Sequence, residues 1–441
     1  VMYLGCNQRR EQITLYGGIL ANCVIYDLES FLEQCANRYL EVAPHGTRMK
    51  EAQLPFLQDE EDHGPSRNPT TNTGACCAWR GFVASNTVST VGGDGTSSAS
   101  LTKEVSSPAK EEDDGVRGQL ADAAASILME ILYAARMARF DLLRATCRLA
   151  CYITKWTEEC DKRLLRLIRY IHCSKGYRQI GWVGDPLSDL TPHLYADADF
   201  AGCADTQRST SGVHLSIEGP NSHFPINGIS KRQGSISSST PEAEFNCGHF
   251  AYKNCLLPSL DLWEEILPRG FVPVFHEDNQ AMLQVVRSGK NPTMRHLGRV
   301  HRIAVAWLYE RLGQHPDRDN VEMLSTNKTP LATDIYTKAF TDSVKWDNAL
   351  KLVNIVPEKD IEKFILDYHL YFPDDEETPA AACPGSATGV SESSLHAPGR
   401  AVDKVIQIHL DADAFHFLVC KTDDIVVSRC VVFDLTNGEL I

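Results

Sequence analysis

The chain has 441 residues, 43% of them hydrophobic, and a formal net charge of −15. This length suits two or three domains, and the acidic total argues against a nucleic-acid-binding surface that covers the whole protein. No apolar run approaches the ~20 residues that a membrane-spanning helix needs. The 15 cysteines have no paired spacing and no signal peptide is recognisable, so we expect a reduced, intracellular protein with no membrane partner. The chain begins at Val1 rather than Met, as expected for a fragment of a longer protein.

The first 122 residues divide into a helical part and a linker. Within 1–57, apolar residues recur at helical spacing between Leu28 and Leu40, which predicts an amphipathic helix packed on a partner. Residues 58–122 are rich in Gly, Ser, Thr and charged residues. Such a composition buries too little apolar surface to offset chain entropy, so we expect a disordered linker.

Residues 123–172 carry the apolar pattern of two helices together with many basic residues. Between Ala125 and Arg178, lysine and arginine clearly outnumber aspartate and glutamate, and a local excess matters more to a phosphate backbone than the total charge. Arg163, Arg166 and Arg169 lie three apart on one side of the second helix. Two interpretations stay open for these arginines, a solvated face and a contact with a duplex backbone.

Residues 193–340 show three strands and then alternating helices and strands. Strands are predicted at 193–198, 211–217, 224–230, 272–276 and 321–325, and helices from 240, at 278–288, at 300–312 and at 330–340. Pro241 suits the first turn of the helix that starts at 240, and Gly289 closes the helix at 278–288. This order predicts an α/β fold with a mixed five-stranded sheet flanked by helices. Ligands of such open sheets bind outside the strand ends.

Four acidic residues stand where a predicted strand ends or a helix lies: Asp197, Glu244, Asp278 and Asp334. Taken singly, each is more often structural; Asp278, for example, suits a helix N-cap. Glu242 suits the first turn of its helix, which leaves Glu244 to face the sheet. Asp334 is expected inside the last helix, where an acid has no capping role. Taken together, four carboxylates on rigid elements suit hard divalent cations such as Mg²⁺.

A basic segment follows the predicted helix 278–288. Arg295, Arg299 and Arg302 are candidates for contacts with nucleic-acid phosphates. His301 lies among them and allows two interpretations. We favour a member of the basic surface, and the alternative is a proton relay beside a metal-activated water.

Several runs of this sequence occur in an order typical of one family. The runs Y-A-D-A-D-F-A-G, S-S-S-T-P-E-A-E-F, E-D-N-Q-A and L-A-T-D-I-Y-T-K resemble the ribonuclease H domain of copia-type retrotransposon Pol polyproteins. The likeness spans Leu194–Phe340. Upstream, Tyr133–Ala145, Lys155–Ile171 and Gly181–Asp185 resemble the segment that joins the reverse transcriptase to that domain. No Y-x-D-D polymerase motif is present, so we do not expect polymerase activity.

The resemblance divides the chain into parts. It implies a remnant of the reverse transcriptase thumb at 1–57, a helical connection segment at 123–185 and a ribonuclease H-like domain at 193–340. We expect a helical tail at 341–372, a second disordered linker at 373–400 and a small β-rich extension of unknown role at 401–441.

The resemblance also implies a chemistry. Asp197, Glu244, Asp278 and Asp334 would bind two Mg²⁺ (or Mn²⁺) ions and act in endonucleolytic hydrolysis of the RNA strand of RNA–DNA hybrids. The hybrid and the reverse transcriptase part of the same polyprotein are the implied partners, in a cytoplasmic particle or the nucleus. Asn246 departs from the family pattern, as does Gly248 two residues later. Two alternatives therefore stay open, a catalytically inactive nucleic-acid-binding relic and a structural remnant without function.

Overall fold

The computed structural model describes seven stretches of the body of the chain and five short strands near its end. The stretches are 2–3, 5–57, 116–203, 206–267, 270–290, 299–326 and 331–368. For 2–3, 299–303 and the strands between 406 and 440, only the backbone is described. Most of the predicted linker at 58–122 and the whole of the linker at 373–400 lie outside the described residues.

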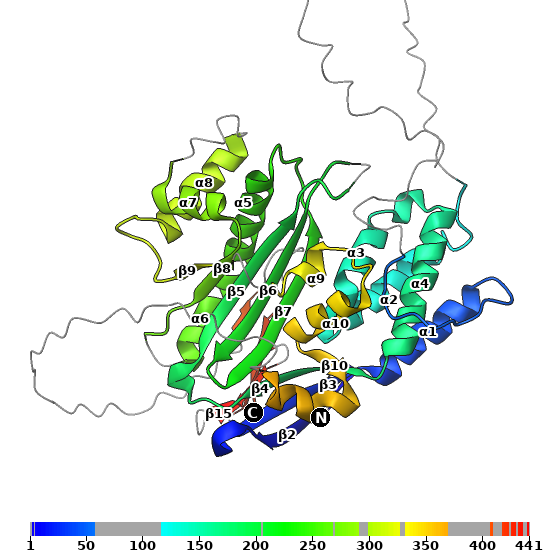
Figure 1. Cartoon of the computed structure of the whole chain (residues 1–441), viewed down its shortest axis with the longest axis horizontal. Helices are drawn as coiled ribbons and strands as arrows, with labels where there is room; N and C mark the ends of the chain where they lie inside the picture. The colour runs from blue at the N-terminus through cyan, green and yellow to red at the C-terminus, as the bar shows by residue number, and fades with distance from the viewer. Residues whose placement is uncertain are drawn as a thin grey trace, which may run out of the picture.

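A mixed sheet forms the centre of the fold (Figure 1). Its ten strands are β1 (Met2–Tyr3), β2 (Cys6–Thr14), β3 (Leu20–Asp27), β4 (Tyr177–Val183), β5 (Thr191–Asp199), β6 (Thr210–Gly219), β7 (Ser222–Arg232), β8 (Val274–Glu277), β9 (Glu322–Ser325) and β10 (Ile355–Pro357). The order is β1-β2-β3-β4-β7-β6-β5-β8-β9, with β10 on β4. β5, β6 and β7 pair antiparallel, while β8 and β9 continue parallel to β5. The α/β prediction with a mixed sheet is confirmed.

The sheet extends beyond the region in which strands were predicted. The five strands expected within 193–340 lie side by side as β7-β6-β5-β8-β9, and β7 continues into β4 through the pair Trp182 and His223. The hairpin of β2 and β3 then adds to β4. This hairpin falls in the part expected to be helical in its middle. The helix is present as α1 (Glu29–Val42), which buries Leu32, Cys35 and Tyr39.

Helices that follow β7 in the chain cover one face of the sheet (Figure 1). They are α5 (Thr240–Ala251), the π-helical turn η6 (Tyr252–Leu256), α6 (Leu257–Ile266), α7 (Gln280–Ser288) and α8 (Arg299–Leu312). Leu194 and Ala196 of β5 alternate toward this face and pack with Phe245 of α5 and Phe275 of β8. This core fixes α5 over β5 and β6.

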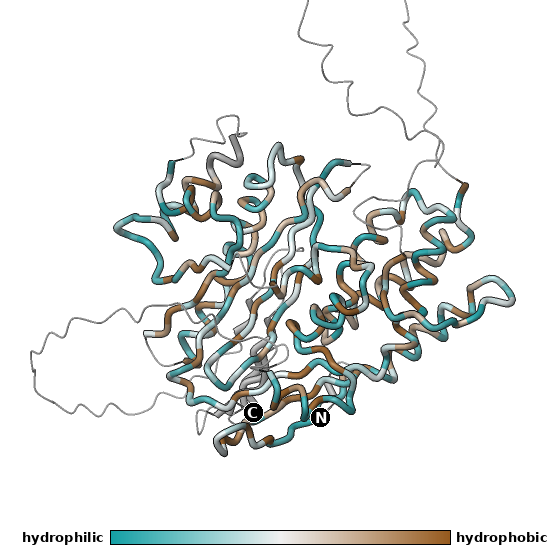
Figure 2. Tube along the Cα trace, in the orientation of Figure 1, coloured by the Kyte–Doolittle hydropathy of each residue, from teal (hydrophilic) through white to brown (hydrophobic). Residues whose placement is uncertain are grey.

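A second layer lies against β7 on the opposite face. It contains α2 (Ala124–Met137), α3 (Leu143–Ala150), α4 (Glu158–Ser174), α9 (Asp334–Thr337) and α10 (Ser343–Leu352). Hydrophobic residues gather where α2, α3 and α4 face one another, while the loop after α1 is hydrophilic (Figure 2). The layer packs on the sheet through Phe224 of β7 and Tyr336 of α9.

The two helices predicted over 123–172 are three. The chain breaks after α2 because Arg139 turns inward and pairs with Asp141, with 2.7 Å between Nη2 and Oδ2. Arg139 also donates to the carbonyl of Ser174, and Tyr170 donates to Asp141. A buried charge pair whose remaining groups are hydrogen-bonded is tolerated in a core, and it ties the break to the end of α4.

The structure gives each of the three α4 arginines a partner within the chain. Arg163 is buried and pairs with Glu159. Arg166 donates from Nε to the carbonyl of Leu54 at 2.8 Å, and Arg169 donates to the carbonyl of Arg48. Arg166 and Arg169 therefore hold the segment after α1 against α4. Sequence periodicity placed them on one side but gave no sign of the chain that covers it.

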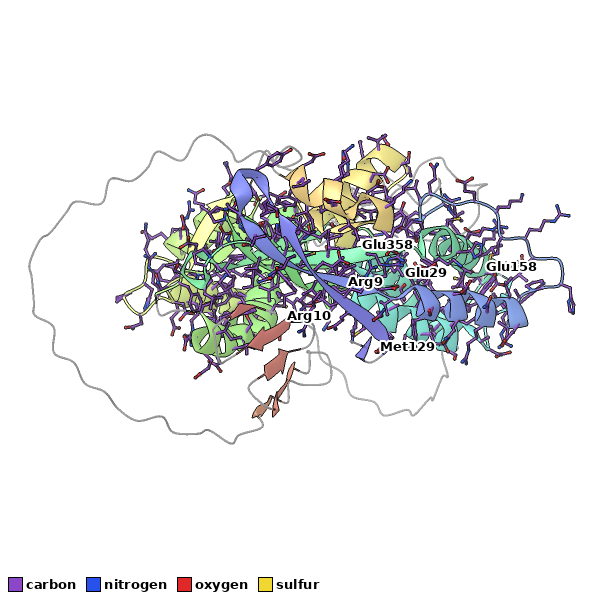
Figure 3. All side chains as sticks on the ribbon, turned by 90° about the horizontal axis from the view of Figure 1, so that it is seen from below. Arg9, Arg10, Glu29, Met129, Glu158 and Glu358 are labelled. Carbon is purple, nitrogen blue, oxygen red and sulfur yellow. The ribbon has the colours of Figure 1, made fainter. Side chains whose placement is uncertain are left out.

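The predicted helical tail at 341–372 is interrupted. Between α10 and α11 (Ile361–Leu366) the chain forms β10, which pairs with β4. Glu358 follows β10 and reaches two arginines, Arg9 of β2 and the buried Arg178 of β4. Figure 3 shows Arg9, Glu29 and Glu358 close together in the view from below. Ion pairs therefore join the N-terminal hairpin to the tail.

Near the end of the chain, the β-rich pattern expected at 401–441 is matched by five strands. They are β11 (Ile406–Ile408), β12 (Phe417–Thr422), β13 (Ile425–Ser428), β14 (Val431–Asp434) and β15 (Glu439–Leu440), paired antiparallel in that order. Across the described ranges, no helix has the length and apolar character needed to cross a bilayer.

Candidate metal centre

Three carboxylates from separate elements meet at one end of β5. Asp197 lies on β5, Glu244 on α5, and Asp278 directly after β8. One oxygen of each lies within 4.8 Å of the other two. Tyr195 pairs with His276 in the parallel ladder, and this register brings the residues two positions further along each strand to the same end of the sheet. Asp197 and Glu244 are buried, and Asp278 is half-buried.

Neighbouring residues take the capping roles that the acids could have filled. Asn279 caps α7, accepting the N–H of Met282 at 3.0 Å. The N-cap interpretation of Asp278 is therefore wrong. Glu242 accepts the backbone N–H of Ser238 at 2.7 Å, which closes the start of α5. Glu244, one half-turn further on, is left to face the other two acids.

Burial and mutual repulsion raise the pKa of each acid in this group. Burial is the main cause for Glu244, whose pKa rises from 4.5 to about 10, and the charges of Glu277 and Asp197 add to it. Burial raises the pKa of Asp197 to about 6, against the lowering effects of Lys338 and Thr337. Burial also raises the pKa of Asp278. The fold thus brings together acids whose negative charges repel one another and are offset only in part by Lys338.

A further carboxylate lies beside this group. Glu277 is fully buried, and its pKa is well above the ordinary value because of burial, with Asp278 and Asp197 as further causes. Its Oε1 accepts the N–H of Asn279 at 3.1 Å. Among the described residues, Oε2 of Glu277 and Oε2 of Glu244 have no hydrogen-bond partner. Orphaned buried carboxylate oxygens are costly.

This donor set fits a hard divalent cation. All ligand atoms are carboxylate oxygens, which Mg²⁺ and Mn²⁺ prefer. A cation among Asp197, Glu244 and Asp278 would offset the repulsion that adds to their raised pKa values, and it could engage Oε2 of Glu244, which has no hydrogen-bond partner among the described residues.

Asp334 lies at the margin of the cluster. It is the first residue of α9, which is one turn long, rather than an interior residue of the helix predicted at 330–340. Its Oδ1 accepts a hydrogen bond from Lys338. The structure does not bring Asp334 into the group within 4.8 Å, although its charge raises the pKa values of Asp197 and Asp278.

Sequence reasoning missed two residues that act on the cluster. The hydroxyl of Thr337, buried on α9, donates to Oδ2 of Asp197 and so fixes the orientation of that carboxylate. Glu277 is the other. Both stand in runs that were singled out, T-D-I-Y-T-K and E-D-N-Q-A, but only the packing of α9 and the burial of β8 show what they touch.

The predicted phosphate-binding segment is not tested by the structure. Arg295 lies outside the described residues. Arg299, His301 and Arg302 lie on α8, but their side chains are among those not described. Their roles stay predictions.

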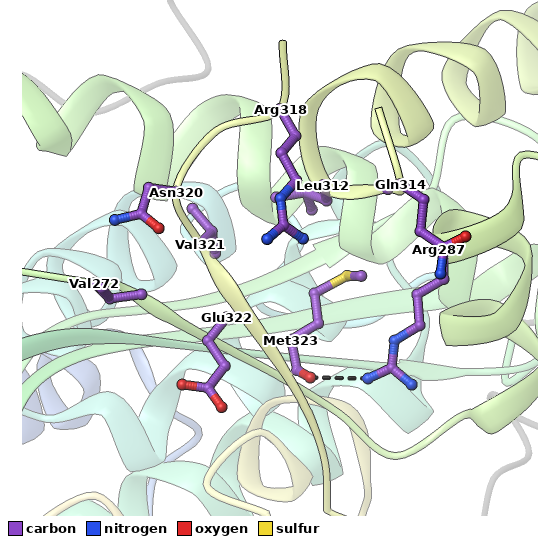
Figure 4. Close-up of a pocket in the computed structure, with 10 residues that line it drawn as sticks. Val272, Arg287, Leu312, Gln314, Arg318, Asn320, Val321, Glu322 and Met323 are labelled. Atoms are coloured by element: carbon purple, nitrogen blue, oxygen red, sulfur yellow. Dashed lines mark hydrogen bonds between the residues drawn. The ribbon is translucent and has the colours of Figure 1, made fainter. Parts of the chain in front are cut away.

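A hollow lies elsewhere, beside β9 (Figure 4). It measures about 310 Å³ and includes Arg287, Arg318 and Glu322 in its wall. Arg287 donates to the carbonyl of Met323 at 3.0 Å, so its guanidinium supports β9. None of the four predicted acids lines this hollow.

Comparisons with known proteins agree with a retrotransposon origin. The chain is 34% identical over 107 residues to the retrovirus-related Pol polyproteins from transposons RE1 and RE2 of Arabidopsis thaliana. The matched part is 24% of this chain and 7% of each relative, so the chain spans a small fraction of their length. No family model matches, and no solved structure matches. These findings support descent of the matched part from a retrotransposon Pol polyprotein.

Proposed function

We propose that this chain is a retrotransposon-derived, metal-dependent endonuclease of the ribonuclease H type, which hydrolyses the RNA strand of RNA–DNA hybrids. The observation that carries the proposal is the convergence of Asp197, Glu244 and Asp278 within 4.8 Å. The strand order β7-β6-β5-β8-β9, with α5 across it, is compatible with a ribonuclease H-like fold. The similarity to Pol polyproteins supports the origin.

Asp197, Glu244 and Asp278 would hold the metal, with Asp334 completing a second position. When bound, two divalent ions activate the attacking water and stabilise the leaving oxygen of a phosphodiester. The chain's own residues orient this site. Thr337 fixes one oxygen of Asp197, and Lys338 offsets part of the negative charge while it holds Asp334. Discrimination of RNA from DNA would rest on the 2′-hydroxyl and the shape of the hybrid.

The test is cleavage of an end-labelled RNA–DNA hybrid by the full chain, with Mg²⁺ and with chelator, beside Asp278→Asn. Asp317→Asn, at an exposed acid outside the cluster, is the matched control. We expect only the RNA strand to be cut, cleavage to require Mg²⁺, and Asp278→Asn alone to abolish it. Cleavage retained by Asp278→Asn would refute the assignment. A folded protein that binds the hybrid without cutting it would be the inactive relic.

A further inference from the structure

One arginine of the connection segment contacts two residues beside the candidate metal centre. Arg144 lies on α3, almost fully buried, about fifty residues before Asp197 in the sequence. Its Nε donates to the carbonyl of Thr337 at 2.8 Å. Its Nη2 lies 3.6 Å from Oδ2 of Asp199. One guanidinium therefore bridges the last residue of α9 and the last residue of β5.

These two contacts flank the hydrogen bond that orients Asp197. The Thr337 residue whose carbonyl accepts from Arg144 also donates its hydroxyl to Oδ2 of Asp197. Asp199 lies two residues beyond Asp197 on the same strand, so the two side chains project to the same side. A shift of Arg144 would move both the strand end and the hydroxyl donor.

The short helix α9 needs such support. It is only four residues long, too short to be stable through its own hydrogen bonds. The carbonyl at its C-terminal residue has no partner within the helix, and Arg144 supplies one. The absence of a side chain at Gly212 lets α9 pack closely on β6, because a Cβ there would lie 2.6 Å from Cγ2 of Thr337. The position of Thr337 is therefore set from β6 on one side and from α3 on the other.

We propose that Arg144 is a positioning residue for the metal centre, through which the connection segment sets the geometry of Asp197 and Thr337. This inference rests on the proposed function and adds to it a dependence on a residue outside 193–340. Arg144 touches neither metal nor substrate. Its planar, forked guanidinium serves two acceptors at once, which a lysine ammonium does poorly.

The experiment measures metal binding apart from cleavage. Mn²⁺ is titrated into the full chain and into Arg144→Met, Arg144→Lys and Arg163→Met, with calorimetry as readout. Replacing a residue that orients a metal ligand typically lowers the affinity for the metal by about tenfold or more. We expect Arg144→Met to raise half-saturating Mn²⁺ about tenfold and to lower kcat on the hybrid while KM stays near the wild-type value. The half-saturating Mn²⁺ of Arg144→Lys should lie between those of the wild type and Arg144→Met.

Arg163→Met is the matched control, since it removes another buried arginine with an ion pair, in this case to Glu159 on α4. It should lower the melting temperature without changing half-saturating Mn²⁺. The inference is overturned if Arg144→Met is half-saturated at the same Mn²⁺ concentration as the wild type. If the methionine variant does not fold, the same result in Arg144→Lys overturns it. In either case, cleavage by the wild type still upholds the proposed function. If the wild type neither binds Mn²⁺ nor cleaves, the proposed function fails and the inference fails with it.

Discussion

Replacing Glu244 by glutamine should stabilise the metal-free protein and abolish its response to Mg²⁺. The pKa of Glu244 rises from 4.5 to about 10, chiefly through burial and then through Glu277 and Asp197. The folded chain therefore keeps a proton here that the unfolded chain releases above about pH 4.5. Stability from this group is fully present below that pH and is lost as the pH rises toward 10.

The size of this loss of stability follows from the interval between the unfolded pKa of 4.5 and the pH of the measurement. Each pH unit above 4.5 costs about 1.4 kcal/mol of the free energy of unfolding, so the cost at about pH 7.5 reaches roughly 4 kcal/mol. This is an upper bound, because Glu277 shares the repulsion and the site can relax. Glutamine carries no charge at any of these pH values, so it removes the repulsion between this position and Glu277. We expect a gain of ~2–4 kcal/mol in chelator at about pH 7.5.

Urea unfolding at several pH values, in chelator and in Mg²⁺, measures both effects. A ligand that binds only the folded state at about a hundred times its Kd adds roughly 2.7 kcal/mol, and this increment should be present in the wild type and absent in Glu244→Gln. Glu242→Gln removes an acid from the same helix outside the cluster, where an amide oxygen can still accept from Ser238, and should keep the Mg²⁺ increment. A Glu244→Gln protein that is no more stable in chelator and keeps the wild-type pH slope would refute the electrostatic argument.

Two further predictions concern the packing and pH response of the same sheet. Gly212→Ala should lower the free energy of unfolding by about 1–3 kcal/mol and weaken Mg²⁺-induced stabilisation, because its Cβ would lie 2.6 Å from Thr337 Cγ2 and 3.0 Å from the Thr333 carbonyl oxygen. Thermal unfolding with and without Mg²⁺ measures both effects. A melting-temperature shift on Mg²⁺ addition equal to that of the wild type would count against this prediction. Burial lowers the pKa of His214 to about 3, so its contribution is complete above about pH 6.5 and is lost as the pH falls toward 3, by about 1.4 kcal/mol per unit. Urea unfolding between about pH 7 and pH 5 should therefore show a smaller loss of the free energy of unfolding for His214→Gln than for the wild type. Equal losses would contradict the lowered pKa of His214.

Local patterns were sufficient for the five strands within 193–340. Alternating apolar residues predicted β5 to β9 within a few residues, and Gly289 closes α7 in the left-handed conformation that favours glycine. The helix predicted at 330–340 is one turn, Asp334–Thr337. No local signal in 1–57 or 341–372 announces that β3 and β10 both pair with β4, since such pairing is decided between segments far apart in the chain.

The candidate site was predictable in its acids and not in its surroundings. Asp197, Glu244 and Asp278 lie at strand and helix positions that a sheet of this order brings together, and the structure does bring them together. The roles of Asn279 and Glu242 in capping could be guessed from residue type, but only the geometry separates them from Asp278 and Glu244. Thr337 and Arg144 act through contacts across sequence separations that no spacing rule reaches.

The acids of the cluster need a scaffold that extends beyond 193–340. Like charges at this distance oppose folding until a cation binds, so the surrounding packing must hold them in place. Part of that packing comes from residues 123–185, because Phe224 of β7 and Tyr336 of α9 belong to the same hydrophobic core as α2, α3 and α4. The sheet also runs without interruption from β7 into β4. Cutting the chain between 185 and 193 would expose that core and release the contact of Arg144 with α9. The packing of residues 123–185 therefore supports the candidate metal centre.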